Sequence, residues 1–145
     1  MKFKNNHLLK AGFSLLELLV VILILGILAA FVAPNLIGTG EKAKRDLVCS
    51  QMSTVEQTLD MFKLDNGFYP DTEEGLQALI SNPDSEKYPN YRNTPYIKKV
   101  PKDSWQNPIA YLKNDEGFEL ISFGADRKEG GVENGADIFY SQCNQ

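Results

Sequence analysis

Hydrophobic residues follow three patterns along the chain, and the first is a nearly unbroken apolar run. Residues 13–33 have the sequence FSLLELLVVILILGILAAFVA. A helix needs about 20 apolar residues to cross a bilayer, so this run is just long enough. Pro34 follows, lacks a backbone donor and is expected to kink or loosen the helix there. The first pattern therefore predicts a membrane-spanning helix over residues 13–33.

The second pattern is that of an amphipathic helix, and it begins at Glu41. Steps of four and three residues place one set of apolar side chains on one face, namely Val48, Met52, Val55, Leu59 and Phe62. The opposite face carries polar side chains, namely Lys44, Gln51, Thr54 and Thr58. Asn66-Gly67 supplies a helix stop. We expect the apolar stripe to pack as core against a sheet rather than to form a binding groove.

The third pattern consists of short elements separated by polar segments. Asp71–Glu74 has the form of a capping box and predicts a short helix that continues to Ile80. Residues 81–108 are rich in Pro, Asn, Ser and Tyr and predict an ordered but irregular loop. Three segments predict strands, namely 109–113, 118–123 and 138–141. The expected fold class is α+β, with a long N-terminal helix packed on a small antiparallel sheet.

One charged residue, Glu17, interrupts the first apolar run. A carboxylate in lipid is costly unless it is paired or protonated, so Glu17 is a candidate functional residue. The lysine-containing leader before the run is also typical of an ordinary secretory signal peptide. Such a peptide would leave a mature N-terminus near Ala30 or Phe31. Its apolar core is usually about 7–15 residues long and uncharged, and this run departs from both features.

Composition and charge narrow the classes of function. The length of 145 residues fits one small domain beyond the apolar run. The formal charge of −4 argues against nucleic-acid binding, which requires basic patches. The single histidine is His7, in the leader, and the sequence has no phosphate-binding loop and no zinc-helix motif. We therefore expect that the chain is not an enzyme and binds no nucleic acid.

The two cysteines, Cys49 and Cys143, leave two alternatives open. Neither belongs to a CxxC pair, which argues against a metal site. The part after the apolar run is expected outside the cytoplasm, where disulfides persist. A bridge would tie the C-terminal tail to the long helix, whereas the alternative is two unpaired, partly buried thiols. The sequence alone does not place their Cα atoms within bridging range.

An acidic, glycine-rich segment near the C-terminus is the candidate ligand site. Four carboxylates lie within twelve residues, namely Asp126, Glu129, Glu133 and Asp137. Interspersed glycines allow the backbone to curl so that carbonyl groups point inward. Calcium prefers about 6–8 oxygen ligands from carboxylates and carbonyls, although this segment lacks the spacing of an EF-hand. The alternative is a solvated acidic loop without a ligand.

The residues around Glu17 resemble the class III signal of type IV pilins and pseudopilins. A basic leader, Gly12, Phe13 and Glu17 stand in the same order as in that family. The resemblance implies that a prepilin peptidase cleaves after Gly12 and that Phe13 becomes N-methylated. It also implies that Glu17 contacts the N-terminal amine of a neighbouring subunit during assembly. Cleavage would remove three lysines and change the formal side-chain charge from −4 to −7.

Three later segments narrow the resemblance to the major pseudopilins of type II secretion systems. They are LDMFKLDNGFYPDTEEGLQALI (59–80), YIKKVPKDSWQNPIAY (96–111) and SFGADRKEGGVENGADI (122–138). Two departures stand out. The family usually has Pro-Trp-Gly-Asn-Pro where this chain has Ser-Trp-Gln-Asn-Pro at 104–108, and it continues Gly-Asn-Trp where this chain has Ile-Phe-Tyr at 138–140.

The resemblance implies a type IV pilin-like fold with a C-terminal ligand loop. Residues 1–12 would be a leader, 13–33 a transmembrane and filament-core helix, and 34–145 a periplasmic globular domain. The implied function is that of the major subunit of a homopolymeric pseudopilus that drives export of folded proteins across the outer membrane. The alternative is a type IV pilin for adhesion or motility.

The implied location is the inner membrane, with a single span and the lysines of the leader on the cytoplasmic side. The resemblance implies five kinds of partner besides further copies of the chain: the prepilin peptidase, an assembly platform, its ATPase, minor pseudopilins and an outer-membrane secretin.

The resemblance also implies a structural calcium ion in the C-terminal loop. By position, the Phe123 carbonyl and the carboxylates of Asp126 and Asp137 match the family's ligands. Glu133 stands where an Asp is common, and Gly135 stands where many members have an Asp. Either Glu133 or the Asn134 side chain is expected to compensate for Gly135. The loss of that carboxylate is expected to weaken the affinity for calcium.

Overall fold

The computed structural model describes residues 12–143, apart from the side chains of 33–39 and 134. Most of the predicted leader therefore lies outside the described residues. The chain divides into two compact units, Met1–Thr39 and Gly40–Gln145. The division falls later than the end of the apolar run at residue 33.

One helix, α1 (Leu15–Asn66), contributes residues to both units. It includes both helices predicted from the sequence as a single element, and it ends at Asn66, as the stop signal predicts. The helix continues through Pro34, where the sequence predicts a kink or loosening. A proline removes one donor from the helical ladder, and here this loss does not end the element.

The apolar stripe of the second half of α1 is the centre of the core. Its five predicted residues have no exposed surface: Val48, Met52, Val55, Leu59 and Phe62. The prediction for Thr58 is wrong, because this residue is buried rather than on the polar face. Thr58 stands three residues after Val55 and four before Phe62, so it belongs to the stripe. Its hydroxyl donates a hydrogen bond to the carbonyl of Thr54 at 2.9 Å, which satisfies the buried polar group.

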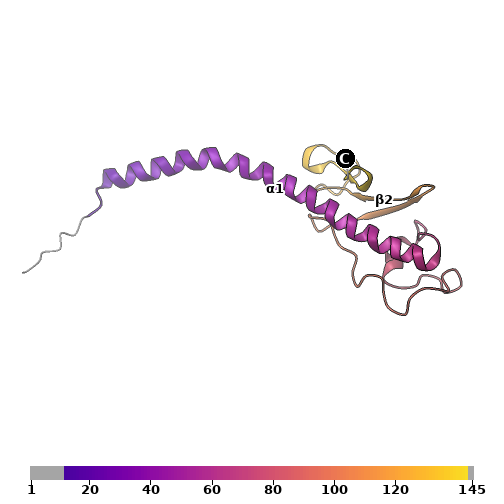
Figure 1. The fold of residues 1–145 in the computed structure, drawn as a ribbon. Coiled ribbons are helices and arrows are strands. Elements are labelled where there is room, and N and C mark those ends of the chain that lie inside the picture. Colours follow the sequence, from indigo (N-terminus) through magenta and orange to yellow (C-terminus); the bar gives the residue numbers. More distant parts are fainter. Residues whose placement is uncertain (1–11, 144–145) are drawn as a thin grey trace, which may run out of the picture. The chain divides into compact units, whose positions relative to one another are not determined.

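The core is closed by an antiparallel sheet in the order β1-β2-β3, with strands β1 (Ala110–Asn114), β2 (Gly117–Ser122) and β3 (Ile138–Phe139). Figure 1 shows β2 alongside the second half of α1. The three strands confirm the predicted segments with slightly shifted ends. The third strand is shorter than predicted, because Tyr140–Gln142 forms the 3₁₀ helix η3 instead of continuing the strand.

Aromatic rings hold the irregular segment 81–108 against α1. The ring centroids of Tyr88, Tyr91 and Tyr96 lie 5.0, 6.0 and 5.2 Å from that of Phe62. The first two pairs are edge-to-face, an arrangement that stabilises aromatic clusters beyond simple burial. The segment therefore has no regular element of its own over most of its length but is packed like a core element.

The predicted capping box is only half formed, and the helix that follows is the 3₁₀ helix η1 (Gly75–Leu79). The Glu74 carboxylate accepts a hydrogen bond from the Asp71 backbone amide at 2.8 Å. The Asp71 carboxylate instead contacts the ammonium groups of Lys113 and Lys87. These hydrogen bonds, that of Lys113 foremost, lower the pKa of Asp71 to about 2. The box residues thus serve to connect η1 with β1 and the 81–108 segment.

A tight turn at 103–107 contains a non-glycine residue in the left-handed region. Gln106 has a φ of 66° and donates its backbone amide to the Asp103 carbonyl at 3.0 Å. Its side chain is exposed. Side chains disfavour this conformation by about 1–2 kcal/mol because Cβ approaches the following carbonyl. The glycine usual at this position in the resembling family avoids that strain.

Replacement of Gln106 by glycine should therefore stabilise the chain. We expect Gln106→Gly to raise the free energy of unfolding by about 0.5–1 kcal/mol, because relief of strain exceeds the added entropy of the unfolded chain. Urea unfolding of the purified protein measures the change. The matched control is Gln106→Ala, which also removes the exposed side chain but keeps Cβ. Equal stability of both variants would contradict the strain argument.

Candidate functional site

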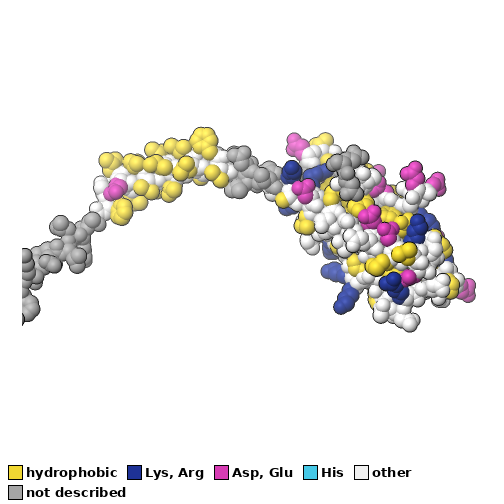
Figure 2. Space-filling view, in the orientation of Figure 1, with side chains coloured by type: hydrophobic (Ala, Val, Ile, Leu, Met, Phe, Trp, Pro, Cys, Tyr) yellow, Lys and Arg dark blue, Asp and Glu magenta, His cyan; other side chains and the backbone are white. Residues whose placement is uncertain are grey.

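The first half of α1 presents an exposed apolar surface over its described side chains. Leu15–Val32 has a mean hydropathy of 3.1 and is long and apolar enough to cross a membrane. All described side chains of this segment are exposed, and Figure 2 shows the continuous hydrophobic surface that they form. Leu15 is 83% exposed and Phe13 is 80% exposed. A surface of this kind requires lipid or protein to cover it.

Glu17 lies in the first turn of α1, just after Phe13 and the exposed Leu15. The N-terminal end of a helix carries partial positive charge from its unpaired amide groups, so it is the favourable end for a carboxylate. The structure thus places Glu17 at the end of the apolar surface rather than at its centre. Gly12, Phe13 and Ser14 precede the helix, have no regular secondary structure and are exposed.

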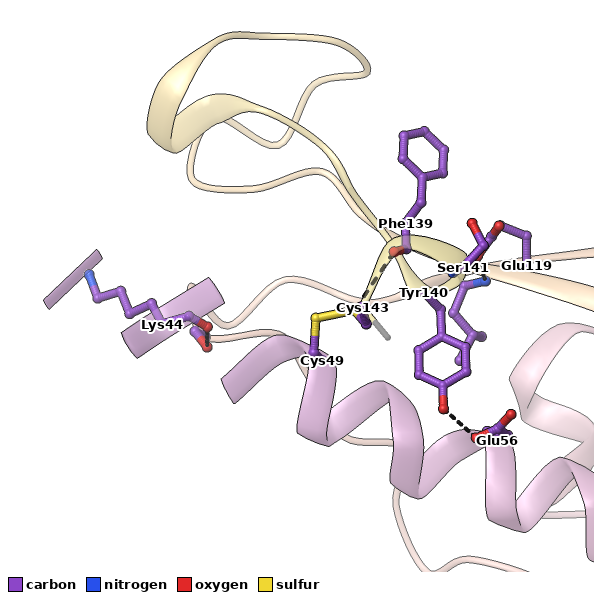
Figure 3. The surroundings of a disulfide bond; sticks show 10 residues. Lys44, Cys49, Glu56, Glu119, Phe139, Tyr140, Ser141 and Cys143 are labelled. Atoms are coloured by element: carbon purple, nitrogen blue, oxygen red, sulfur yellow. Dashed lines mark hydrogen bonds between the residues drawn. A yellow bond between two sulfur atoms is a disulfide. The ribbon is translucent and has the colours of Figure 1, made fainter. Parts of the chain in front are cut away.

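A disulfide joins Cys49 of α1 to Cys143, with Cα atoms 5.6 Å apart (Figure 3). The sequence leaves open a disulfide or two unpaired thiols, and the structure contains the disulfide. Figure 3 shows the neighbouring contacts of the same tail: the Tyr140 hydroxyl donates to the Glu56 carboxylate, and the Ser141 amide donates to Glu119 at 3.1 Å. The C-terminal tail is therefore tied to both α1 and β2.

The acidic loop folds its two predicted aspartates onto a glycine turn. Asp126 lies so close to Gly135 that a Cβ at Gly135 would stand 2.7 Å from Oδ2 of Asp126. A Cβ at Gly131 would stand 2.3 Å from the Gly135 carbonyl oxygen. The Asp137 carboxylate accepts a hydrogen bond from the Gly130 amide at 2.8 Å through Oδ2. Only glycine fits at 131, where a Cβ would meet backbone, whereas at 135 a Cβ would meet only the Asp126 side chain, which can move. Both carboxylates contact this turn.

One oxygen of this pair has no partner. Oδ1 of Asp137 is buried and accepts no hydrogen bond from any described residue. An unsatisfied buried carboxylate oxygen is unfavourable unless a cation or water supplies the missing interaction. Calcium takes such oxygens together with carbonyl groups, so the donor set of Asp126 and Asp137 fits this ion.

Glu133 does not complete a cluster of three carboxylates with Asp126 and Asp137. Among the described residues, no three His, Cys, Asp or Glu side chains converge on one point. Glu133 is exposed, with a φ of 51° in the 3₁₀ helix η2 (Glu133–Gly135). Its backbone carbonyl and that of Ala136 accept hydrogen bonds from Nη1 of Arg45 at 3.4 and 3.2 Å. The three predicted carboxylate ligands therefore do not gather at one point, and the Asn134 side chain, which is also expected to compensate for Gly135, lies outside the described part of the structure.

Arg45 is the functional contact that the sequence does not reveal. It lies on α1, one turn before Cys49, and binds carbonyl groups of a loop about 90 residues later in the chain. Helical periodicity places Arg45 off the apolar stripe but gives no signal for a partner so distant in sequence. Arg45 and the disulfide together attach the C-terminal loop to α1.

Two family models match the chain. The model described as "Type II secretion system (T2SS), protein G" matches residues 35–141. The model described as "Prokaryotic N-terminal methylation motif" matches residues 9–33, which include Gly12, Phe13 and Glu17.

Individual relatives agree with these models. The "Type II secretion system core protein G" of Vibrio cholerae is 48% identical over 131 residues, which cover 89% of this chain and 90% of the relative. The protein of the same name from Pseudomonas aeruginosa is 45% identical over 132 residues, which cover 89% and 93%. The crystal structure of the major pseudopilin from the type 2 secretion system of enterohaemorrhagic Escherichia coli is also similar. Its TM-score is 0.64 at 37% identity, over 77% of this chain and 96% of that one.

Loss of the disulfide should destabilise the C-terminal unit. Cys49 and Cys143 are 94 residues apart. We expect replacement of both by serine to lower the free energy of unfolding by about 2–4 kcal/mol, because the unfolded chain regains the entropy of an open loop. Urea unfolding in detergent measures this. Dithiothreitol should destabilise the parent protein but leave the double variant unchanged, whereas equal stability of the two oxidised proteins would contradict the prediction.

Proposed function

The chain belongs to the type II secretion system protein G family and is a major pseudopilin, and we propose that it polymerises in the periplasm into a short helical filament that drives export of folded proteins across the outer membrane. The observation that carries this proposal is the exposed apolar surface of Leu15–Val32, with Glu17 in the first turn of α1. The relatives named above are secretion proteins, and this does not favour the alternative of a type IV pilin for adhesion or motility.

In this mechanism the apolar surface is buried first by lipid and then by other subunits. Before assembly, lipid of the inner membrane surrounds the segment. After extraction from the bilayer, the same side chains pack against those of other subunits in the filament core. Both the lipid and the filament core are apolar environments. The free-energy cost of removing the segment from lipid is therefore offset by its burial against neighbouring copies.

Glu17 sets the register between subunits in this proposal. Cleavage after Gly12 creates an ammonium group on Phe13, which is then methylated. In a poorly solvated helix bundle, an isolated carboxylate or ammonium is costly, and the two groups of adjacent subunits offset this cost by pairing. The pair forms only at one stagger of the helices, which makes it a device for alignment.

The chain contributes structure rather than catalysis to secretion. Members of its family are pseudopilin subunits, and we propose that other components supply the chemistry and the work. The prepilin peptidase cleaves the leader, and an ATPase and a membrane platform drive assembly. Minor pseudopilins and the outer-membrane secretin are the remaining proposed components of the export route. The globular unit would lie in the periplasm, in agreement with its disulfide.

We also propose that the C-terminal loop binds one calcium ion with a structural role. Asp126 and Asp137 would supply carboxylate oxygens and Phe123 a carbonyl oxygen. The unpartnered Oδ1 of Asp137 and the close approach of Asp126 to Gly135 support this assignment. When bound, the ion would offset the charge of both carboxylates and stiffen the loop. Glu133 remains a predicted ligand that would have to move to take part.

Removal of the Glu17 carboxylate tests the assembly role. We expect Glu17→Ala to leave cleavage after Gly12 largely intact, as measured by N-terminal sequencing, but to abolish most filament formation and secretion, because the register contact is lost. Glu17→Asp is the matched control, since it keeps the charge and should retain more assembly. Normal secretion by Glu17→Ala would contradict the role of Glu17 in register.

Removal of a loop carboxylate tests the calcium proposal. We expect Asp126→Ala and Asp137→Ala to lower the melting temperature more in calcium than in chelator, because the bound ion adds stability through these side chains beyond that of their hydrogen bonds to the Lys128 and Gly130 amides. In chelator, the variants should lose only the smaller contribution of these hydrogen bonds. An equal loss in calcium and in chelator would indicate that the two side chains contribute only packing and hydrogen bonds.

A further inference from the structure

Asp103 is a buried carboxylate without a cationic partner. It has no exposed surface, and none of the ion pairs among the described residues includes it. Oδ1 accepts hydrogen bonds from the amides of Trp105 at 3.0 Å and Asn107 at 2.7 Å. Oδ2 accepts a hydrogen bond from the Ser122 hydroxyl at 2.7 Å. A buried charge is costly even when it is hydrogen-bonded, so this one calls for a specific role.

The hydrogen bonds of Asp103 continue to the residue that opens the C-terminal loop. Because the Ser122 hydroxyl donates to Asp103, its oxygen is left to accept, and the Gly124 amide donates to it at 3.3 Å. The Asn107 side-chain amide donates to the Gly124 carbonyl at 3.1 Å. Gly124 is buried and has a φ of 64°, which favours glycine. Both peptide groups of Gly124 are therefore fixed by the same polar cluster.

This arrangement determines where the Phe123 carbonyl points. The peptide bond between Phe123 and Gly124 is trans and planar, so its C=O and N–H groups point in opposite directions. The N–H points at the Ser122 hydroxyl, inside the cluster. The carbonyl oxygen of Phe123 consequently points away from the cluster. The orientation of a proposed calcium ligand is thus set by Ser122 and, through it, by Asp103.

We propose that Asp103 and Ser122 are positioning residues for calcium binding by the C-terminal loop, acting through the Gly124 amide on the Phe123 carbonyl. This inference rests on the proposed calcium site. Neither residue is a ligand, because each acts through the backbone that follows β2. Residues that orient the ligands of a metal affect its affinity without touching it, and their loss typically weakens binding by about 10–100-fold.

Calcium titration of the processed full-length chain in detergent, by isothermal titration calorimetry, tests the proposal. Ser122→Ala deletes the hydroxyl and should weaken calcium binding about 10-fold or more. Asp103→Asn is the gentler variant, since it keeps the shape and one acceptor for the amides of the turn. It removes the charge that orients the Ser122 hydroxyl and should weaken calcium binding in the same direction.

Tyr111→Phe is the matched control for a purely structural effect. It deletes a buried hydroxyl that donates to the Pro70 carbonyl at 2.7 Å, and neither residue belongs to the loop or its polar cluster. This variant should lose stability in chelator but keep the calcium affinity of the parent chain. The positioning role would be overturned if Ser122→Ala and Asp103→Asn both bound calcium as tightly as the parent chain. It would also be overturned if Tyr111→Phe lost as much calcium affinity as these two variants. Neither outcome would contradict the calcium site itself. Absence of calcium binding by the parent chain would overturn the calcium proposal as well, without touching the pseudopilin assignment.

Discussion

Apolar surface has to be covered, and α1 meets this requirement in two different ways. Its second half buries one stripe against the sheet and the aromatic segment, so the cover comes from the same chain. Its first half exposes apolar side chains on all sides, so the cover has to come from lipid or from other copies. This difference separates the part of the molecule that folds alone from the part that assembles. Everything after α1 contributes to the first part, and in our proposal Glu17 contributes to the second.

The parts of the fold that could be predicted are those that depend on local spacing. The stripe from Val48 to Phe62 follows from helical periodicity, and the hairpin follows from two alternating segments and a turn. The end of α1 at Asn66 follows from the Asn-Gly signal at 66–67. Thr58 is the exception, because its polar side chain predicts the solvent-facing side whereas its spacing places it on the buried stripe. Its hydroxyl can satisfy itself within the helix, so a threonine is tolerated on the buried face.

The candidate site could be predicted only in part, because its contacts join distant parts of the chain. Composition and resemblance predict the loop carboxylates at 126 and 137, but whether a third carboxylate joins them depends on how the glycine turn folds. Arg45 contacts a loop about 90 residues away, and no local pattern encodes that pairing. The same holds for Cys49 and Cys143, whose approach depends on the packing of the whole unit.

The disulfide also determines how the C-terminal unit carries mechanical load. A pull along α1 from its N-terminal side reaches Cys49 before most of the buried stripe, and there a covalent branch leads directly to Cys143. The sheet and the C-terminal loop lie inside this closed covalent ring. Traction therefore cannot peel the tail away or unravel the sheet from its last strand. A force applied to α1 before Cys49 is therefore transmitted to Cys143 through a covalent bond as well as through the rest of the helix.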